Sequence, residues 1–225
     1  MLGRDIAKAV ADLFFHETIK AKQSVSPLEI PVVDDPIFPT KAFSKFLSSI
    51  GERESPVILD FGPALGSNVD YFGEQLGCKL FIEDLYADLE RFSQEGNLGE
   101  FSEFLATRLS QADSSVDGIL CWDLIDYLEP AAARVLGQQV VRLLRPGGTA
   151  LGFFSTLDTP TCQYTKYLVV DEVSLRHRPY PATRGRQPML LNREIVRLFG
   201  GLNVMESFLL RVNAREVLFQ KPIYT

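Results

Sequence analysis

Residues 57–66 constrain the fold more than any other stretch of the chain. An apolar run ends in the carboxylate of Asp60, and Gly62, Ala64 and Gly66 follow at every second position. A short apolar run of this kind predicts a buried strand, and the small residues after it allow the backbone to approach a ligand closely. An amphipathic pattern begins directly afterwards, so the turn also opens a helix whose free N–H groups face the ligand.

Alternating helix and strand patterns follow this turn. Helical patterns lie at 66–76, 86–96, 130–144 and 192–199. Buried strands are expected at 79–83, 117–122 and 149–154. Two closing strands near 204–211 and 215–220 predict a terminal antiparallel β-hairpin. Because strands that alternate with helices pack into a parallel sheet covered on both faces, we expect an α/β fold with a Rossmann-like doubly wound sheet.

Two later segments are harder to assign. The apolar side chains of residues 98–111 fit a helix, whereas a doubly wound sheet requires a third strand at about this point. We expect a helix, with a very short strand near 104–106 as the alternative. Residues 155–190 show no long periodicity, and a short strand is expected only at Val169 and Val170.

The N-terminal part predicts a helical cap, residues 1–51, in front of one globular domain at 52–225. Apolar stripes indicate helices at 3–21 and 40–50, and Thr40 can cap the second of them. A proline-rich loop joins the two helices. Either both helices cover the sheet, or the first helix and this loop close over a bound ligand.

Composition excludes several classes of protein. At 225 residues the chain is long enough for one well-packed α/β domain. A net charge of −6 argues against a general binder of nucleic acid or anionic membranes. The three cysteines are far apart, so neither a disulfide framework nor a metal site is expected. The N-terminus does not resemble a signal peptide and no apolar run is long enough to span a bilayer, so we expect a cytoplasmic protein.

An acidic pair at the end of the second expected strand adds chemistry to the glycine turn. Asp84 lies 22 residues after Gly62, where a carboxylate can accept hydrogen bonds from both hydroxyls of a ribose. Glu83 is the alternative, because neighbouring strand residues point in opposite directions and only one of the two can serve. The glycine spacing differs from the G-x-G-x-x-G pattern of NAD-binding dehydrogenases.

Four segments together resemble a known family. Residues 58–66 look like the first motif of class I S-adenosylmethionine-dependent methyltransferases, and residues 111–120 are similar to the segment that enters their fourth strand. Residues 143–148 resemble the turn before their fifth strand, and the terminal hairpin fits their reversed last strand. The resemblance covers residues 40–221 and implies the class I methyltransferase fold.

The resemblance implies a cofactor, S-adenosylmethionine, and residues to bind it. The turn from Asp60 through Phe61 would hold the methionine part, with Gly62, Ala64 and Gly66 against the cofactor and Asp60 near its ammonium group. Asp84, or its alternative Glu83, would bind the ribose, and Cys121 and Trp122 would face the cofactor at the end of the fourth strand. The family's adenine-binding aspartate is missing, since Leu105 stands at its position, which leaves backbone or Ser110 for that contact.

Asp123 is the candidate catalytic residue. It would follow the fourth strand directly and contact either the methyl acceptor or the cofactor's amino group. A general base is required only for acceptors such as hydroxyls or protonated amines. The alternative is that Asp123 caps the turn that follows it.

Residues 155–190 supply the candidate acceptor site. The segment carries five Lys/Arg against three Asp/Glu and lies on the face where open α/β sheets bind ligands. One hypothesis is that it binds an acceptor bearing a carboxylate or phosphate, because arginine suits both. The other is a surface loop that pairs with the acidic residues between 83 and 103. The candidate residues are Tyr164, Arg176, His177, Arg178 and Tyr180.

The sequence therefore predicts a methyltransferase for a small-molecule acceptor, with no metal, nucleic-acid or membrane partner. Its oligomeric state is left open. A rival from another class is a catalytically silent domain that kept the fold and binds the cofactor. An NAD-dependent oxidoreductase is the second rival, which the glycine spacing and the terminal hairpin disfavour.

Overall fold

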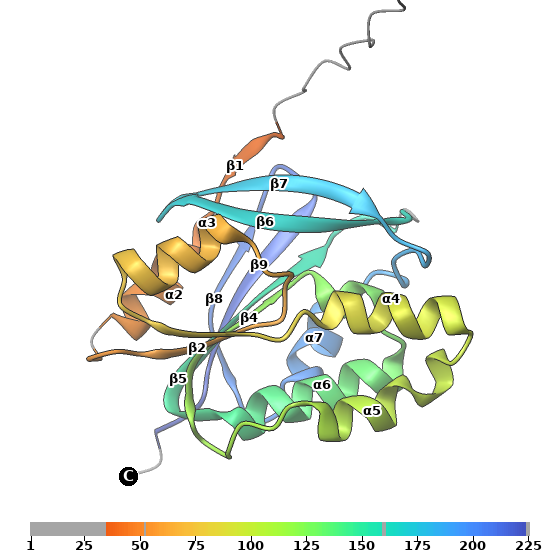
Figure 1. Cartoon of the computed structure of the whole chain (residues 1–225), viewed down its shortest axis with the longest axis horizontal. Coiled ribbons are helices and arrows are strands. Elements are labelled where there is room, and N and C mark those ends of the chain that lie inside the picture. The colour runs from red at the N-terminus through yellow and green to blue at the C-terminus, as the bar shows by residue number, and fades with distance from the viewer. Residues whose placement is uncertain (1–34, 52, 159–160, 224–225) are drawn as a thin grey trace, which may run out of the picture. The chain divides into compact units, whose positions relative to one another are not determined.

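The computed structural model describes residues 35–51, 53–158 and 161–223 (Figure 1). Asp35–Thr225 form one compact unit. The helix expected at residues 3–21 and most of the proline-rich loop lie outside the described residues. The helix at the end of the predicted cap, α2 (Ala42–Ile50), belongs to the compact unit.

A six-stranded sheet confirms the predicted fold class. Its first four strands are parallel neighbours, and the last two form the antiparallel hairpin at the C-terminal end. In spatial order the strands are β3 (Lys79–Ile82), β2 (Val57–Asp60), β4 (Val116–Trp122), β5 (Leu144–Ser155), β9 (Ala214–Gln220) and β8 (Asn203–Leu209). The parallel strands all end at one edge of the sheet, which is called the carboxyl edge below.

Helices cover both faces of this sheet (Figure 1). One face carries α4 (Leu85–Glu95), α5 (Phe101–Arg108), α6 (Pro130–Leu143) and α7 (Asn192–Leu198). The other face carries α2 and α3 (Gly66–Val69), which continues as a π-helical segment, Asp70–Gln75. Side chains alternate between the faces: Leu59 packs with the first group of helices, and Ile58 packs with the second.

The helix predicted at residues 98–111 is confirmed as α5, and the alternative of a short strand at 104–106 is wrong. Phe101 and Leu105, four residues apart, are both buried, which is a helical spacing. Phe101 packs against Phe92 of α4, with ring centroids 5.2 Å apart. Strand β3 is therefore the outermost strand of the sheet on this side.

The segment at 155–190 differs most from expectation. It forms two long antiparallel strands, β6 (Gln163–Asp171) and β7 (Ser174–Pro181), where only a short strand at Val169 and Val170 was expected. These two strands are called the hairpin below, and β8 with β9 the terminal hairpin. The short strand β1 (Ile37–Pro39) pairs with β7 and completes a second, three-stranded sheet. The periodicity is weak because protein covers parts of both faces of the hairpin, so apolar and polar residues do not alternate regularly.

Helix α2 is attached to the sheet at its N-terminus. The buried side chain of Glu216, on β9, accepts hydrogen bonds at Oε2 from the backbone N–H groups of Lys41 and Ala42, each at 2.8 Å. Thr40 accepts a bond from the Phe43 N–H at 3.3 Å, as predicted for a capping residue. A carboxylate at a helix N-terminus also complements the helix dipole. Of the two roles considered for the N-terminal helices, the one observed for residues 40–50 is to cover the sheet.

Candidate functional site

The glycine turn after β2 is held by an internal hydrogen-bond cluster. Asp60 Oδ1 accepts from the backbone N–H of Gly62 at 2.8 Å and from the indole Nε1–H of Trp122 at 2.6 Å. A Cβ atom at position 62 would lie 2.9 Å from the Trp122 ring, so glycine is required by this contact. Phe61, between the two, points into the core and is fully buried. The closest approach at Gly62 is therefore to Trp122.

Burial changes the acidity of Asp60. Burial raises its pKa to about 6, and the hydrogen bonds from Gly62 and Trp122 partly oppose that rise. In this structure both hydrogen bonds to the buried carboxyl group of Asp60 come from the protein itself. Its predicted contact with a cofactor ammonium stays a prediction.

The outer part of the turn is open. Ala64 and Gly66 are exposed, and a Cβ atom at Gly66 would meet no atom within 4 Å. Helix α3 begins at Gly66, so its first N–H groups lie at this open surface. This part of the turn has the geometry expected of a ligand-binding loop.

The two acidic residues after β3 have different roles. Glu83 is bound by Arg108 and Gln111, and Arg108 also bonds its backbone carbonyl. Asp84 adopts a left-handed backbone (φ 42°) and caps α4 by accepting from the Ala87 N–H at 3.2 Å. Among the described residues, Oδ2 of Asp84 takes no hydrogen bond. Of the two candidates for a ribose, Asp84 is the one with a carboxylate oxygen to spare.

Cys121 and Ser110 lie away from the open turn. Cys121 is completely buried among the side chains on the α4–α7 face, and burial raises the pKa of its thiol. Ser110 is exposed, just beyond α5. Their predicted cofactor contacts stay predictions.

A cavity of about 240 Å³ lies at the carboxyl edge, beside β4 and β5. It is lined by residues of both sheets, among them Phe38 of β1, Phe153 of β5, and Tyr167 and His177 of the hairpin. Asp123, Asp126 and Arg186 supply its charged groups. We refer to it as the edge cavity.

Two buried carboxyl groups stand side by side in the edge cavity. Asp123 accepts from the Tyr86 hydroxyl and pairs with Arg186, whose Nη2 lies 3.1 Å from Asp123 Oδ2. Asp126 Oδ2 accepts from the Ser155 N–H at 2.7 Å. Burial, followed by the charge of Asp123, raises the pKa of Asp126 to about 7. Burial also raises the pKa of Asp123, although Arg186 opposes the rise.

Aromatic side chains form one wall of the edge cavity, and Trp122 packs against one of them, Tyr167, without itself lining the cavity. The rings of Trp122 and Tyr167 stack with centroids 5.1 Å apart and an interplanar angle of 5°. Trp122 holds a left-handed backbone (φ 49°), an unfavourable conformation for a bulky residue. The His177 ring lies 4.8 Å from that of Tyr167, and burial lowers the pKa of His177 to about 4. His177 is therefore neutral at neutral pH.

Tyr164 and Tyr180 lie on the other side of the hairpin. Their rings are 5.3 Å apart, and Tyr164 packs edge-on against Tyr86. The hydroxyl of Tyr180 is buried without a hydrogen-bond partner among the described residues. The charges of Asp84 and Asp123 contribute to raising its pKa, after burial. Tyr180 is thus within electrostatic range of both carboxylates, from the side of the hairpin opposite His177.

A buried asparagine fastens the hairpin to the helix that follows the glycine turn. Asn68 donates from Nδ2 to the carbonyl of Tyr167 and accepts at Oδ1 from the N–H of Val169, both at 2.9 Å. Its side chain therefore acts as a short continuation of the β6 backbone ladder. This contact fixes Tyr167, and with it the stack on Trp122.

The predicted acceptor arginines do not reach the carboxyl groups. Arg178 is exposed and pairs with Asp35, while Arg176 is half-buried and makes no ion pair among the described residues. Arg186 is the arginine that pairs with Asp123, and Arg184 pairs with Glu129. The alternative, contact with the acidic region, occurs through other groups: Glu90 of α4 bonds Thr183 and Tyr164.

Sequence reasoning missed several residues of the edge cavity, chiefly Asp126 and Arg186. Asp126 lies three residues beyond Asp123, a spacing that a single turn of helix brings together, and this was an available signal. Arg186 stands in the same basic segment as the arginines that were chosen. Its position depends on where the hairpin ends, which periodicity did not reveal.

Within the described part of the chain, no helix is long and apolar enough to cross a membrane. The same residues contain no cluster of three or more metal-binding side chains.

Comparison with solved structures identifies the fold. The chain is similar to 1,6-didemethyltoxoflavin-N1-methyltransferase from Burkholderia thailandensis, with 17% identity, a TM-score of 0.51, and 97% of this chain and 86% of that chain covered. It is also similar to an S-adenosylmethionine-dependent methyltransferase from Clostridium acetobutylicum, with 12% identity, a TM-score of 0.47, and coverage of 95% and 100%. No protein-family model and no curated protein matches the sequence. The first likeness establishes that this chain has the class I methyltransferase fold.

Proposed function

We propose that the chain is an S-adenosylmethionine-dependent methyltransferase that acts on a small-molecule acceptor. The observation that carries the proposal is the arrangement at the carboxyl edge. An open glycine turn and the free carboxylate oxygen of Asp84 stand on one side, and the edge cavity with Asp123 and Asp126 lies on the other. Ligands of open α/β sheets bind at this edge.

The residues of the turn fit the cofactor at its outer part. Ala64 and Gly66 leave space there, and Asp84 can accept a hydrogen bond from a ribose hydroxyl. The hydroxyl of Tyr180, buried and without a partner, is a further group available to a polar ligand. Gly62 is different, since the indole of Trp122 already occupies the space beside it.

The chain's contribution to methyl transfer would be to position the acceptor and remove a proton. When bound, S-adenosylmethionine supplies a methyl group on sulfonium, which an acceptor can displace in line. Asp126 Oδ1, which takes no hydrogen bond from the described residues, would accept a proton from a hydroxyl or ammonium acceptor. With a pKa of about 7, Asp126 is partly ionised at neutral pH, as a general base requires.

Arg186 and the aromatic wall would support this step. The guanidinium of Arg186 balances the charge of Asp123, and it also donates from Nε to the Tyr127 hydroxyl at 3.1 Å. Tyr167, His177 and Phe153 line the same cavity, and a bound acceptor packed against them would displace water from it. In the proposal, the acceptor lies against these rings.

Calorimetric titration tests the proposal. We expect S-adenosylmethionine and S-adenosylhomocysteine to bind, and NAD to give no heat of binding. Failure of both adenosyl compounds to bind the full chain would refute the methyltransferase proposal. NAD binding in their place would favour the oxidoreductase.

A catalytically silent cofactor-binding domain is the second candidate. Its supporting observation is the packing of the hairpin, whose Tyr167 ring stacks on Trp122 and is fastened through Asn68. If the hairpin stays in place, little room is left for an acceptor. Cofactor binding without S-adenosylhomocysteine production across small hydroxyl, amine and carboxylate acceptors would favour this candidate, and acceptor-dependent production would exclude it.

The proposed acceptor can carry an anionic group near the hairpin. Arg176 is half-buried and makes no ion pair among the described residues, whereas Arg178 pairs with Asp35. Both arginines lie on the face of β7 opposite His177, so an acceptor in the edge cavity would reach them only by extending past the edge of the hairpin; in that case Arg176→Glu should lower acceptor affinity more than Arg178→Glu does. Unchanged turnover in the double variant would exclude a role of the hairpin arginines in acceptor recognition.

A further inference from the structure

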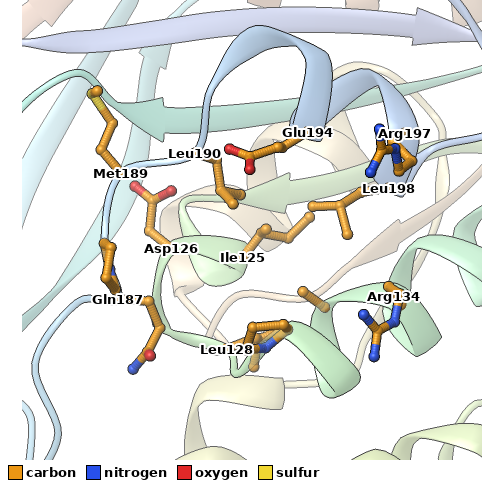
Figure 2. A pocket seen from close by; sticks show the side chains of 13 residues that line it. Ile125, Asp126, Leu128, Arg134, Gln187, Met189, Leu190, Glu194, Arg197 and Leu198 are labelled. Atoms are coloured by element: carbon orange, nitrogen blue, oxygen red, sulfur yellow. The ribbon is translucent and has the colours of Figure 1, made fainter.

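A second cavity lies on the helix side of the sheet, away from the glycine turn (Figure 2). It is formed by the turn after β4, the start of α6, the loop at 187–190 and α7, and its volume is about 380 Å³. This volume is within the range of small-molecule sites, roughly 300 to 1,000 Å³. Its apolar lining consists of Ile125, Leu128, Pro130, Ala133, Pro188, Met189, Leu190 and Leu198.

Two arginines stand at one end of this cavity. Arg134 extends from α6 and Arg197 from α7, and Figure 2 shows both at the end opposite Met189 and Asp126. Both are exposed, and neither makes an ion pair or a side-chain hydrogen bond among the described residues. Most arginines of the described chain have such partners, so two unpaired guanidinium groups at one opening are a feature to be explained.

The other ionisable groups of the cavity are the carboxyl groups of Glu194 and Asp126. Glu194 Oε2 accepts from the Leu191 N–H at 2.8 Å at the start of α7. Asp126 lines both this cavity and the edge cavity, its Oδ2 accepts from the Ser155 N–H, and Figure 2 shows it at the end away from the arginines. The arginines are therefore the groups left to bind a ligand charge.

The walls of the cavity are fixed in place. A Cβ atom at Gly137 of α6 would lie 2.1 Å from the carbonyl oxygen of Leu198, so the two helices touch there through backbone. The Gln187 N–H donates to the carbonyl of Asp126 at 2.7 Å and ties the loop to the turn after β4. A cavity with such walls exists before a ligand arrives, which lowers the cost of binding.

We propose that this cavity binds a small amphipathic carboxylate, with its apolar body against Leu128 and Leu190 and its anionic group between Arg134 and Arg197. The apolar lining would select the body of the ligand, and the two guanidinium groups would select its charge. The site is separate from the proposed cofactor site, and the proposal stands whether or not the carboxyl edge transfers a methyl group.

Methyl NMR gives a local test, and because Met189 also lines a neighbouring cavity that holds Arg193, the variants described below separate the two cavities. The chain has three methionines, of which Met189 lines this cavity and Met205, exposed on β8, lies outside it. In full-length protein labelled with ¹³C at the methionine methyls, titration with octanoate or 4-phenylbutyrate should shift the Met189 signal and leave Met205 unchanged. The signal is assigned with the Met189→Leu variant. Octanol and octylamine serve as uncharged and cationic controls.

Variants at the surface separate charge from fold. Arg134→Gln and Arg197→Gln should each weaken carboxylate binding about tenfold, the usual effect of losing a charged hydrogen bond. Arg193 is an exposed residue of α7 that does not line this cavity, so Arg193→Gln should not change carboxylate binding. Absence of a Met189 shift with both carboxylates, equal binding of octanol, or unchanged binding in the two variants would each overturn the proposal.

Discussion

The two halves of the carboxyl edge are built in different ways. The glycine turn and Asp84 come from residues 57–84, two consecutive strands of the chain, and the outer part of this half is open. The edge cavity combines Asp123 and Asp126 with β1, β5 and the hairpin, which are far apart in sequence. The first half is a local motif, and the second depends on tertiary packing.

Their charges differ in the same way. In the turn, Asp84 is half-exposed and caps a helix, so water screens its charge. In the edge cavity, Asp123 and Asp126 are buried together and depend on Arg186. Substitutions in the edge cavity should therefore change stability and its pH dependence, whereas a substitution of Asp84 should change ligand binding more than stability.

The largest effect is expected from Arg186→Met. Removing the cation leaves Asp123 buried without its partner, which costs about 3 to 5 kcal/mol of unfolding free energy for buried pairs. Arg184→Met is the matched control, because the side chain of its partner Glu129 is 45% exposed, and its cost should stay below about 1 kcal/mol. Urea denaturation measures both. Equal losses in the two variants would mean that the edge cavity is no more sensitive to charge than the surface.

Asp126→Asn should change how stability depends on pH. The folded-state pKa of Asp126 is raised from 3.8 to about 7, so its contribution to stability is present below pH 4 and lost as pH rises towards 7. The wild type should therefore lose on the order of 3 kcal/mol relative to Asp126→Asn between pH 4 and pH 8. Chemical denaturation at several pH values measures the difference. Parallel pH profiles for the two proteins would contradict it.

Trp122→Phe tests the contact that joins the two halves. The change removes the indole N–H that Asp60 Oδ1 accepts and leaves space beside Gly62 and Tyr167. We expect a loss of about 2 kcal/mol from the hydrogen bond and the cavity. In a double-mutant cycle with Asp60→Ala the losses should not add, because Asp60→Ala removes the acceptor of the same bond. Full additivity would show that the bond is not energetically important.

Apolar runs were sufficient to predict the sheet, while side-chain direction was not predictable. β4 has seven consecutive buried residues, and its position was read directly from the sequence. In the hairpin, His177 pairs with Tyr167, and Arg178 pairs with Lys166 on the opposite face. Because neighbouring strand residues point in opposite directions, the basic segment could be recognised but not which arginine reaches Asp123. That choice depends on the register and the end of the hairpin.

The smallest effect on stability is expected at Asp84, and there the two halves should differ most clearly. Asp84→Asn keeps an oxygen that can accept from the Ala87 N–H, so the unfolding free energy should change by less than about 1 kcal/mol. If the carboxylate binds a ribose, S-adenosylhomocysteine binding should weaken by about 1 to 3 kcal/mol. Glu83→Gln is the matched control, since Arg108 and Gln111 already bind that side chain, and it should lower stability more than affinity. A larger loss of affinity in Glu83→Gln than in Asp84→Asn would mean that Glu83, and not Asp84, binds the ribose. It would also mean that ligand binding at the glycine turn depends on tertiary contacts such as those of Glu83, as the edge cavity does.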